Sequence, residues 1–218
     1  MEARFKNRGE AGERLAERLI RYADSNAAVL ALPRGGVPVA YEVATLLHTP
    51  LDTLVARKLG IPGNPEYGVG AIAPADVLVL DEDAITALGI HRRDLNAVME
   101  EETGEMERRI ARYKSGAYID NEDTVILVDD GLATGVTARA AIESVRKTRR
   151  PKRLVFAAPV CARDTALFLR GYVDDVVCLL EPAQFMAVGY WYDTFAQTTD
   201  EEVEFLLEKA NAAYAHTR

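Results

Sequence analysis

Two adjacent carboxylates, Asp129 and Asp130, come directly after the apolar run 124–128. A fully apolar run of this length is typical of a strand that is buried on both faces of a parallel sheet. Ligands of open α/β sheets bind at the carboxyl ends of the strands. The sequence therefore predicts that both acids lie at the edge of a sheet where a ligand binds.

A glycine-containing turn, residues 131–135, follows the two acids, and a helical pattern begins near Val136 or Thr137. The amides and the positive dipole end of such a helix favour a phosphate monoester, and the hydroxyls of Thr134 and Thr137 are further donors. Carboxylates beside a phosphate site fit a sugar phosphate, because they accept hydrogen bonds from ribose hydroxyls or hold a cation. This stretch is our strongest candidate site.

Other nucleotide and phosphate folds fit the sequence less well. A GxxxxGK[ST] loop, which a nucleoside triphosphatase would need, is absent from the sequence. A flavodoxin-like receiver carries paired acids after its first strand, whereas 128 residues precede Asp129 here. Residues 68–73 match GxGxxA, but Pro74 follows and no helical pattern opens there, so a dinucleotide site is not supported.

Short apolar runs alternate with helical patterns along most of the chain. This succession predicts an α/β fold with an open, mainly parallel sheet flanked by helices. We expect a single domain over 1–218, with a core of about 28–180. The expected strands are residues 28–32, 51–56, 69–73, 77–80, 124–128, 153–160 and 175–180.

Two segments interrupt the alternation. A helical insertion is expected over about 83–118, within which 91–113 forms a highly charged helix on the outside of the sheet. A C-terminal hood and helix is expected over about 181–218. Its aromatic residues either form a lid over a site or pack in the core, and its helix opens at Thr199 or Asp200.

Composition narrows the functional classes. The 26 basic and 34 acidic residues of the 218-residue chain give a net charge of −8, which disfavours a nucleic-acid partner unless a local basic patch serves it. The sequence has no apolar run long enough to span a membrane and no signal-peptide core at its charged start. Cys161 and Cys178 lie in apolar runs and are expected to be buried thiols, so we expect a cytoplasmic protein. The three histidines are scattered and do not suggest a zinc site.

The segment VILVDDGLATGVT, residues 125–137, resembles the signature that binds 5-phosphoribosyl-1-pyrophosphate (PRPP) in type I phosphoribosyltransferases. Three further segments follow the order of that family. LPRGGV, residues 32–37, resembles its pyrophosphate loop, and the pair Arg57-Lys58 resembles its basic pair. GNPEYGVG, residues 63–70, is similar to the mobile loop of the adenine-type enzymes.

The resemblance implies roles for these residues. The pyrophosphate would bind Arg34, Gly35, Gly36, Arg57 and Lys58. The acids Asp129 and Asp130 would hold the ribose and stabilise positive charge at its C1 atom, and Glu66 would meet the proton of the acceptor. The ribose phosphate would bind the turn formed by Asp129, Asp130, Gly131, Leu132, Ala133, Thr134, Gly135, Val136 and Thr137. A Mg²⁺ ion would bridge pyrophosphate and ribose near the two acids.

The function implied is transfer of a 5-phosphoribosyl group between PRPP and a small nitrogenous acceptor. Enzymes for 6-oxopurines have an Asp where this chain has Ala133, so guanine and hypoxanthine are disfavoured. The alternative is a regulatory protein that senses PRPP or a nucleotide on the same fold without turnover. The acceptor stays open, as does the choice between a monomer and a homodimer.

Overall fold

The computed structural model describes residues 4–23, 25–61, 63–114 and 122–216. Its centre is a five-stranded sheet in the order β2-β1-β6-β7-β8, and every pair of neighbours is parallel. Val29 aligns with Leu51 on one side and with Ile126 on the other. The strands are β1 (Ala27–Ala31), β2 (Leu51–Thr53), β6 (Thr124–Val128), β7 (Arg153–Val160) and β8 (Asp175–Leu180). The predicted α/β class with a mainly parallel sheet is confirmed.

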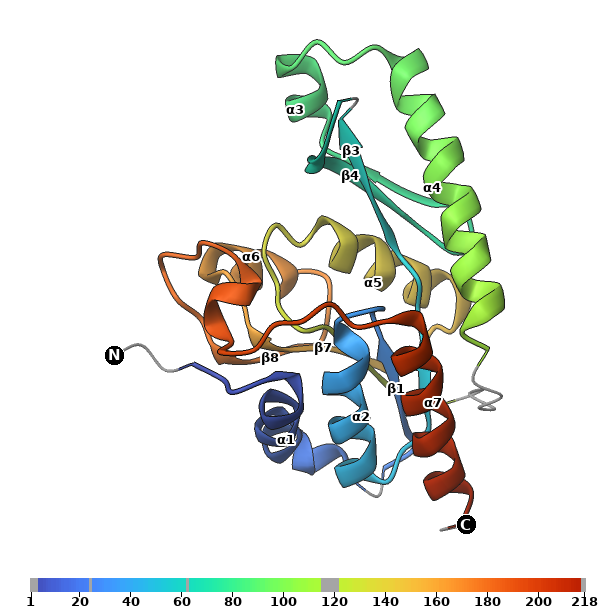
Figure 1. The fold of residues 1–218 in the computed structure, drawn as a ribbon, viewed down its shortest axis with the longest axis vertical. Helices are drawn as coiled ribbons and strands as arrows, with labels where there is room; N and C mark the ends of the chain where they lie inside the picture. Colours follow the sequence, from blue (N-terminus) through green and yellow to red (C-terminus); the bar gives the residue numbers. More distant parts are fainter. Residues whose placement is uncertain (1–3, 24, 62, 115–121, 217–218) are drawn as a thin grey trace.

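Helices cover both faces of this sheet (Figure 1). One face packs against α1 (Arg8–Leu19), α2 (Gly36–Leu47) and α7 (Asp200–Ala215). The other face packs against α5 (Val136–Thr148) and α6 (Arg163–Leu169). Side chains alternate along each strand, so Val29 and Leu30 enter opposite layers of the core. None of the helices in the described residues is both long and apolar enough to cross a membrane.

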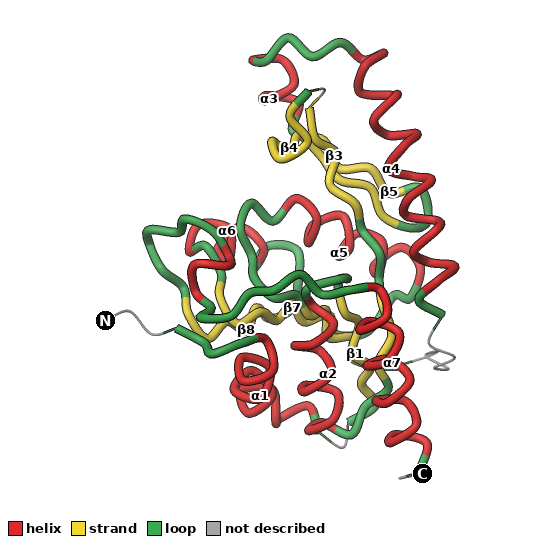
Figure 2. The backbone as a smooth tube through the Cα atoms, in the orientation of Figure 1, coloured by secondary structure: helices red, strands yellow, loops and turns green. Residues whose placement is uncertain are grey.

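A second, antiparallel sheet of three strands lies over α5 (Figure 2). It contains β3 (Arg57–Ile61), β4 (Asn64–Ala73) and β5 (Val77–Leu80). The expectation that 69–73 and 77–80 belong to the main sheet is therefore wrong. Only three residues separate these two strands, and a parallel crossover needs about a dozen. The expected mobile loop 63–70 also belongs to a strand, because Asn64, Gly68 and Gly70 pair with β3 around an irregularity in the register.

The helical insertion contains α3 (Glu82–Ala87) and the long helix α4 (Arg92–Arg112). The predicted charged helix is α4, and it lies on the small sheet rather than on the main one. Leu95 is buried beside Val69 of β4, while most of the helix surface is exposed. The small sheet alone therefore covers the narrow apolar stripe of this helix.

The segment after β8, residues 181–199, is called the strap here. It runs from β8 to α7 across the front of the molecule, past the start of α2 (Figure 1). It contains a short 3₁₀ turn, Val188–Trp191, and it is joined to the N-terminal segment by a hydrogen bond from the Phe5 amide to the Trp191 carbonyl of 2.8 Å. Trp191 and Tyr192 are buried while Tyr190 and Phe195 stay partly exposed, so the aromatic residues serve both core and surface.

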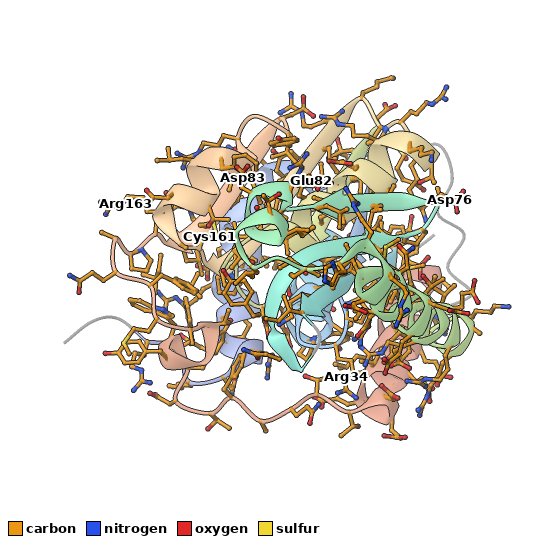
Figure 3. All side chains as sticks on the ribbon, turned by 90° about the horizontal axis from the view of Figure 1, so that it is seen from above. Arg34, Asp76, Glu82, Asp83, Cys161 and Arg163 are labelled. Carbon is orange, nitrogen blue, oxygen red and sulfur yellow. A yellow bond between two sulfur atoms is a disulfide. The ribbon has the colours of Figure 1, made fainter. Side chains whose placement is uncertain are left out.

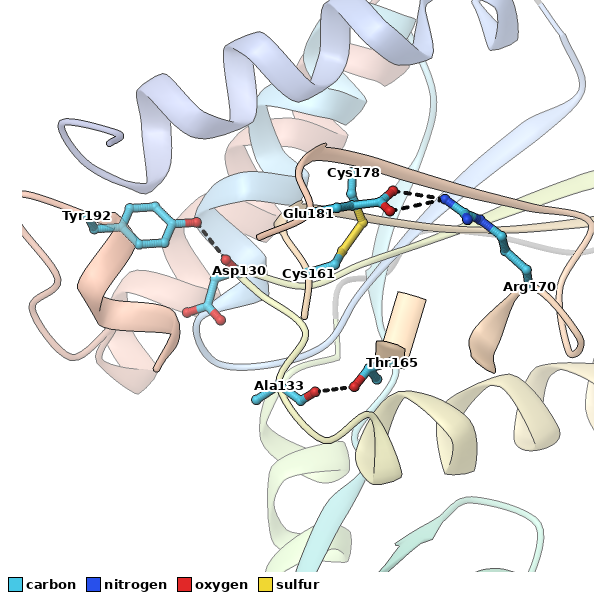
Figure 4. Close-up of a disulfide and its surroundings, with 8 residues drawn as sticks. All are labelled: Asp130, Ala133, Cys161, Thr165, Arg170, Cys178, Glu181 and Tyr192. Atoms are coloured by element: carbon cyan, nitrogen blue, oxygen red, sulfur yellow. Dashed lines mark hydrogen bonds and ion pairs between the residues drawn. A yellow bond between two sulfur atoms is a disulfide. The ribbon is translucent and has the colours of Figure 1, made fainter. Parts of the chain in front are cut away.

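Cys161 and Cys178 are joined in a disulfide, with their Cα atoms 6.2 Å apart (Figure 4). The expectation of two separate thiols is wrong. The parallel pairing of β7 and β8 places Ala158 opposite Cys178, and Cys161 follows at the end of β7. The sequence alone does not reveal that the two cysteines are close in space, because the residues between them form the α6 crossover. The two cysteines therefore do not indicate a reducing compartment, and a cytoplasmic location stays a prediction.

Gly36 and Gly104 allow a paired test of how tightly α2 meets β6. A Cβ atom on Gly36 would lie 2.7 Å from the Val128 carbonyl oxygen and 3.0 Å from the Asp129 Cα atom, whereas one on Gly104 would meet nothing within 4 Å. We expect Gly36→Ala to destabilise the protein by about 1–3 kcal/mol, because backbone must move. Gly104→Ala should stabilise it by up to about 1 kcal/mol. Urea unfolding of both variants checks this, and equal stabilities would contradict the close approach.

Candidate active site

The acid pair and the Arg34 loop meet at the carboxyl edge of the main sheet. Asp129 and Asp130 follow the last residue of β6, and residues 32–35 connect β1 to α2 next to them. A Cβ atom on Gly35 would overlap the Asp130 carboxylate. Only glycines allow the loop to come this close, so the predicted pyrophosphate loop and the predicted ribose-binding acids are neighbours.

The predicted phosphate turn is held firmly on its inner side and is open on its outer side. The Leu132 amide donates to the Val160 carbonyl at 2.8 Å, and the Thr165 hydroxyl donates to the Ala133 carbonyl at 2.6 Å (Figure 4). Leu132 is buried, whereas Ala133 and Thr134 are exposed. Gly135 has φ +76°, a conformation that favours glycine. The turn therefore has a fixed shape and an accessible surface.

The helix that follows this turn has neither a side-chain N-cap nor an acidic residue in its first turn. Gly135 is the N-cap of α5 and makes no side-chain capping bond, and the first turn of α5 contains no acid. Helix α2, which begins at the Arg34 loop, has the same two properties with Gly35 as its N-cap. Helices α1, α3 and α7 are capped by Asn7, Asp81 and Thr199 and have acids in their first turns. The two helices beside the acid pair are thus suited to anions.

A cavity of about 340 Å³ opens on the far side of the turn. Thr134 and Gly135 line it from one side, and the acids at the start of α3 line it from the other; Figure 3 labels two of them, Glu82 and Asp83. Arg139 also lines it but is paired with Glu143 at 3.0 Å. The acids at the start of α3 disfavour an anion inside this cavity.

The two acids are kept close together in a half-buried place. Burial and the charge of Asp130 hold the pKa of Asp129 well above its usual range, while the Asp130 amide, which donates to Asp129 Oδ1 at 2.8 Å, opposes the shift. Burial also raises the pKa of Asp130, and Arg8 opposes that rise. A positive charge that approaches the pair therefore stabilises the ionised carboxylates.

Arg8, which is not among the residues predicted from the sequence, already supplies such a charge. Its Nε and Nη2 atoms lie 2.8 and 2.7 Å from Asp130 Oδ2. Its Nη1 atom donates to the Ala196 carbonyl at 2.7 Å, and its guanidinium lies 3.8 Å from the centre of the Phe195 ring. The Asn7 cap locates Arg8 at the start of a helix, but 122 residues separate it from Asp130, and no local pattern reveals that partner.

The strap contacts the acid pair directly as well. The Tyr192 hydroxyl donates to the Asp130 carbonyl at 2.6 Å (Figure 4), and Val188 fills the space beside Gly131. Burial, followed by the charge of Asp130, raises the pKa of Tyr192, so its hydroxyl stays protonated and remains a donor. The expected hood is therefore in contact with the predicted ribose site.

The predicted arginines are already paired with acids. Arg34 Nη1 lies 3.3 Å from Asp200 Oδ1, and Arg57 donates to Glu102 of α4 at 2.7 Å. Asp200 also binds Arg112 of α4. Glu102 and Arg112 are ten residues apart in one helix, which corresponds to roughly 15 Å along its axis. Helix α4 thus links the acids that hold Arg34 and Arg57.

Arg57 and Lys58 occupy a different element from the one expected. They begin β3 of the small sheet instead of ending a strand of the main one. The stem of Lys58 crosses Gly68, where an added Cβ atom would lie 2.8 Å from Lys58 Cδ. Glu66 belongs to β4, but its side chain lies outside the described part of the structure, so its role stays a prediction.

The acid pair is the candidate source of oxygen ligands for a cation at this edge. Within residues 4–23, 25–61, 63–114 and 122–216, no group of three or more His, Cys, Asp or Glu side chains could hold a metal ion. Mg²⁺ commonly binds through one or two carboxylates and completes its shell with water and substrate phosphates. Asp129 and Asp130 fit such a partial ligand set.

A family model described as the phosphoribosyl transferase domain matches residues 4–194. This chain belongs to that family. The match includes Arg8, both loops, the acid pair and most of the strap, and it ends before α7. The resemblance seen in residues 125–137 is confirmed and extends towards both ends of the chain.

Relatives agree with this assignment. Two curated proteins from Mycobacterium tuberculosis strains, both named "Putative phosphoribosyl transferase", are 41% identical in an alignment of 218 positions that covers 97% of this chain. The chain spans only 48% of their length. The crystal structure of TT1426 from Thermus thermophilus is 38% identical with a TM-score of 0.75, and the alignment covers 94% of this chain and 98% of that one.

The two acids should respond differently to loss of charge. We expect Asp129→Asn to leave the melting temperature unchanged or higher, because it removes a like charge from a half-buried pair. Asp130→Asn should destabilise the protein by about 1–3 kcal/mol, because Arg8 is 12% exposed and loses its ion partner. Thermal unfolding at neutral pH measures both. Equal losses would show that Arg8 does not compensate Asp130.

Proposed function

We propose that this protein transfers a 5-phosphoribosyl group between PRPP and a small nitrogenous acceptor and that pyrophosphate is the leaving group. The main support for this proposal is the position of the acid pair between helices α2 and α5. Both helices have a glycine as N-cap and lack acids in their first turns. Two anion-favouring ends with carboxylates between them match a ligand that has phosphates at both ends and a ribose in the middle.

The charges assign the two ends of the ligand. The turn 131–137 takes the single phosphate, because it offers free helix amides and exposed hydroxyl and backbone groups. Arg34 lies at the other end, beside Gly35, with Arg57 and Lys58 further out on β3. Guanidinium groups bind pyrophosphate oxygens in pairs, so this end takes the more highly charged group.

The acid pair then acts on the ribose. As the bond from C1 to pyrophosphate lengthens, positive charge develops on the ribose and negative charge on the leaving group. Burial and then the charge of Asp130 raise the pKa of Asp129, so a positive charge beside the pair would favour its ionised form. The carboxylates would therefore interact more strongly with the cationic transition state than with neutral ribose. Arg34 neutralises the departing pyrophosphate at the same time.

The proposed reaction depends on Mg²⁺. When bound, the ion neutralises pyrophosphate and polarises its bond to the ribose. Asp129 and Asp130 would hold it together with oxygens of the substrate. Arg8 binds one oxygen of Asp130 and the Asp130 amide donates to one oxygen of Asp129, so neither acid is favoured over the other as a ligand in this proposal.

The acceptor is proposed to be a nitrogen base whose proton passes to Glu66 or to solvent. Ala133 replaces the acid that serves 6-oxopurines in the resemblance, so a base without that requirement fits better. A nucleic acid is not proposed as the partner. Three cations of the basic run near 146–153 are paired with acids, namely Arg146 with Asp174 at 2.9 Å, Lys152 with Asp123 at 2.8 Å and Arg149 with Asp52 at 3.9 Å.

Turnover of labelled PRPP with a panel of nitrogen bases tests the function. Release of pyrophosphate that depends on both a base and Mg²⁺ would support the transferase and identify its acceptor. Tight PRPP binding without turnover across the panel would favour the alternative, a PRPP or nucleotide sensor.

Ligand-selective variants test the two ends of the site. We expect Arg34→Ala to weaken pyrophosphate and PRPP by about tenfold or more and to leave ribose 5-phosphate nearly unchanged. Thr137→Val should weaken ribose 5-phosphate and PRPP but not pyrophosphate. Calorimetry with all three ligands measures this.

Arg163→Ala is the matched control for charge, because Arg163 begins α6 well apart from Arg34 (Figure 3). It should change none of the three affinities. Equal losses for pyrophosphate and ribose 5-phosphate in Arg34→Ala would contradict the assignment of the ends.

A further inference from the structure

Asp200 is the first residue of α7, outside the part of the chain that the family model matches. Its side chain is only 12% exposed and contacts residues of two segments, the Arg34 loop and the end of α4. Oδ1 accepts hydrogen bonds from Arg34 Nη1, at 3.3 Å, and from the Tyr113 hydroxyl; Oδ2 lies 2.7 Å from Arg112 Nη1 and 3.7 Å from Arg108 Nη2. A carboxylate thus already sits on the arginine proposed to bind pyrophosphate.

The contacts of Asp200 are unequal in strength. Those with Arg112 and Tyr113 are short and anchor the carboxylate to the end of α4, whereas the contact with Arg34 is longer. If Arg34 turned away, Asp200 would keep the charge of Arg112 and the hydroxyl of Tyr113. The pKa of Asp200 is held below its usual range by Tyr113 first and then by Arg34, so the group stays ionised near neutral pH.

A pyrophosphate oxygen and the Asp200 carboxylate have the same chemistry for a guanidinium. Both accept charge-assisted hydrogen bonds, and pyrophosphate carries the larger negative charge. The two anions also repel one another when both are near Arg34. Pyrophosphate that binds Arg34 therefore competes with Asp200 for the charge of this guanidinium.

We propose that Asp200 is an affinity-setting residue that competes with pyrophosphate for Arg34. This rests on the proposed function, because it takes Arg34 to be the pyrophosphate ligand. Asp200 weakens the binding of pyrophosphate and of PRPP, and it thereby speeds release of the pyrophosphate product. The competition also couples the pyrophosphate end of the site to α7 and to the end of α4, because Arg112 of α4 binds Asp200 and Glu204 of α7.

Asp200→Asn tests this with inorganic pyrophosphate as the probe, with Mg²⁺ present. The variant keeps the shape of the side chain and removes the competing charge. We expect pyrophosphate to bind about three- to tenfold more tightly and ribose 5-phosphate to bind unchanged, as measured by calorimetry. Asp200→Ala should act in the same direction and serves if the amide variant folds poorly.

Glu201→Gln is the matched control. Glu201 occupies the same first turn of α7 and binds the same Arg112 at 2.7 Å, but it is 74% exposed and contacts Arg112 rather than Arg34. It removes one charge from the same cluster and should leave pyrophosphate affinity within about twofold. In an Arg34→Gln background, Asp200→Asn should lose its effect, because the two residues act as a unit.

Each result decides the proposal. Tighter pyrophosphate binding in Asp200→Asn alone, abolished by Arg34→Gln, supports it. Unchanged or weaker binding in Asp200→Asn overturns it and identifies Asp200 as a structural support of Arg34, and so does an equal gain in Glu201→Gln. Wild-type protein that binds no pyrophosphate overturns it as well. Failure of the proposed function is seen separately, as absence of PRPP turnover in the wild-type protein.

Discussion

The arrangement of the site depends on placing two like charges side by side at the end of one buried strand. Asp129 and Asp130 repel one another and lose solvation there, and this disfavours their ionised forms. The protein compensates only in part, with Arg8 on one carboxylate and a backbone amide on the other. The remaining deficit of positive charge is what makes the pair responsive to a cationic ligand or transition state.

Close contact between loops gives this electrostatic feature its position. Gly35 and Gly36 bring the β1 to α2 connection against the acids, and Gly135 sets the start of α5 on their other side. Neither helix carries its own cap or an early acid. Local helix stability has therefore been given up at the two places where an anionic ligand can restore it, which is a common relation between stability and function.

The outer elements oppose or support those charges. The strap and the N-terminal segment meet at Phe5 and Trp191. Together they bring Arg8 and Tyr192 to the acid pair, and the ring of Phe195 packs on Arg8. On the opposite side, α4 and α7 deliver the acids that pair with Arg57 and Arg34. Asp130, Arg34 and Arg57 are thus each paired with a charge from an element remote in sequence.

Local patterns in the chain determined the strands of the parallel sheet, the start of α5 at Val136 and the resemblance of residues 125–137, because burial on both faces and turn chemistry are written in neighbouring residues. The tertiary structure decided the rest. The short connection 74–76 explains why residues 69–73 and 77–80 pair in an antiparallel way. That they pair with β3 in a second sheet, and not with the main sheet, is a result of the tertiary structure. Cys161 with Cys178, Arg8 with Asp130 and Arg34 with Asp200 are pairs made by chain topology. A single sequence carries no local signal for such pairs, since residues far apart in the chain become neighbours only when the sheet has formed.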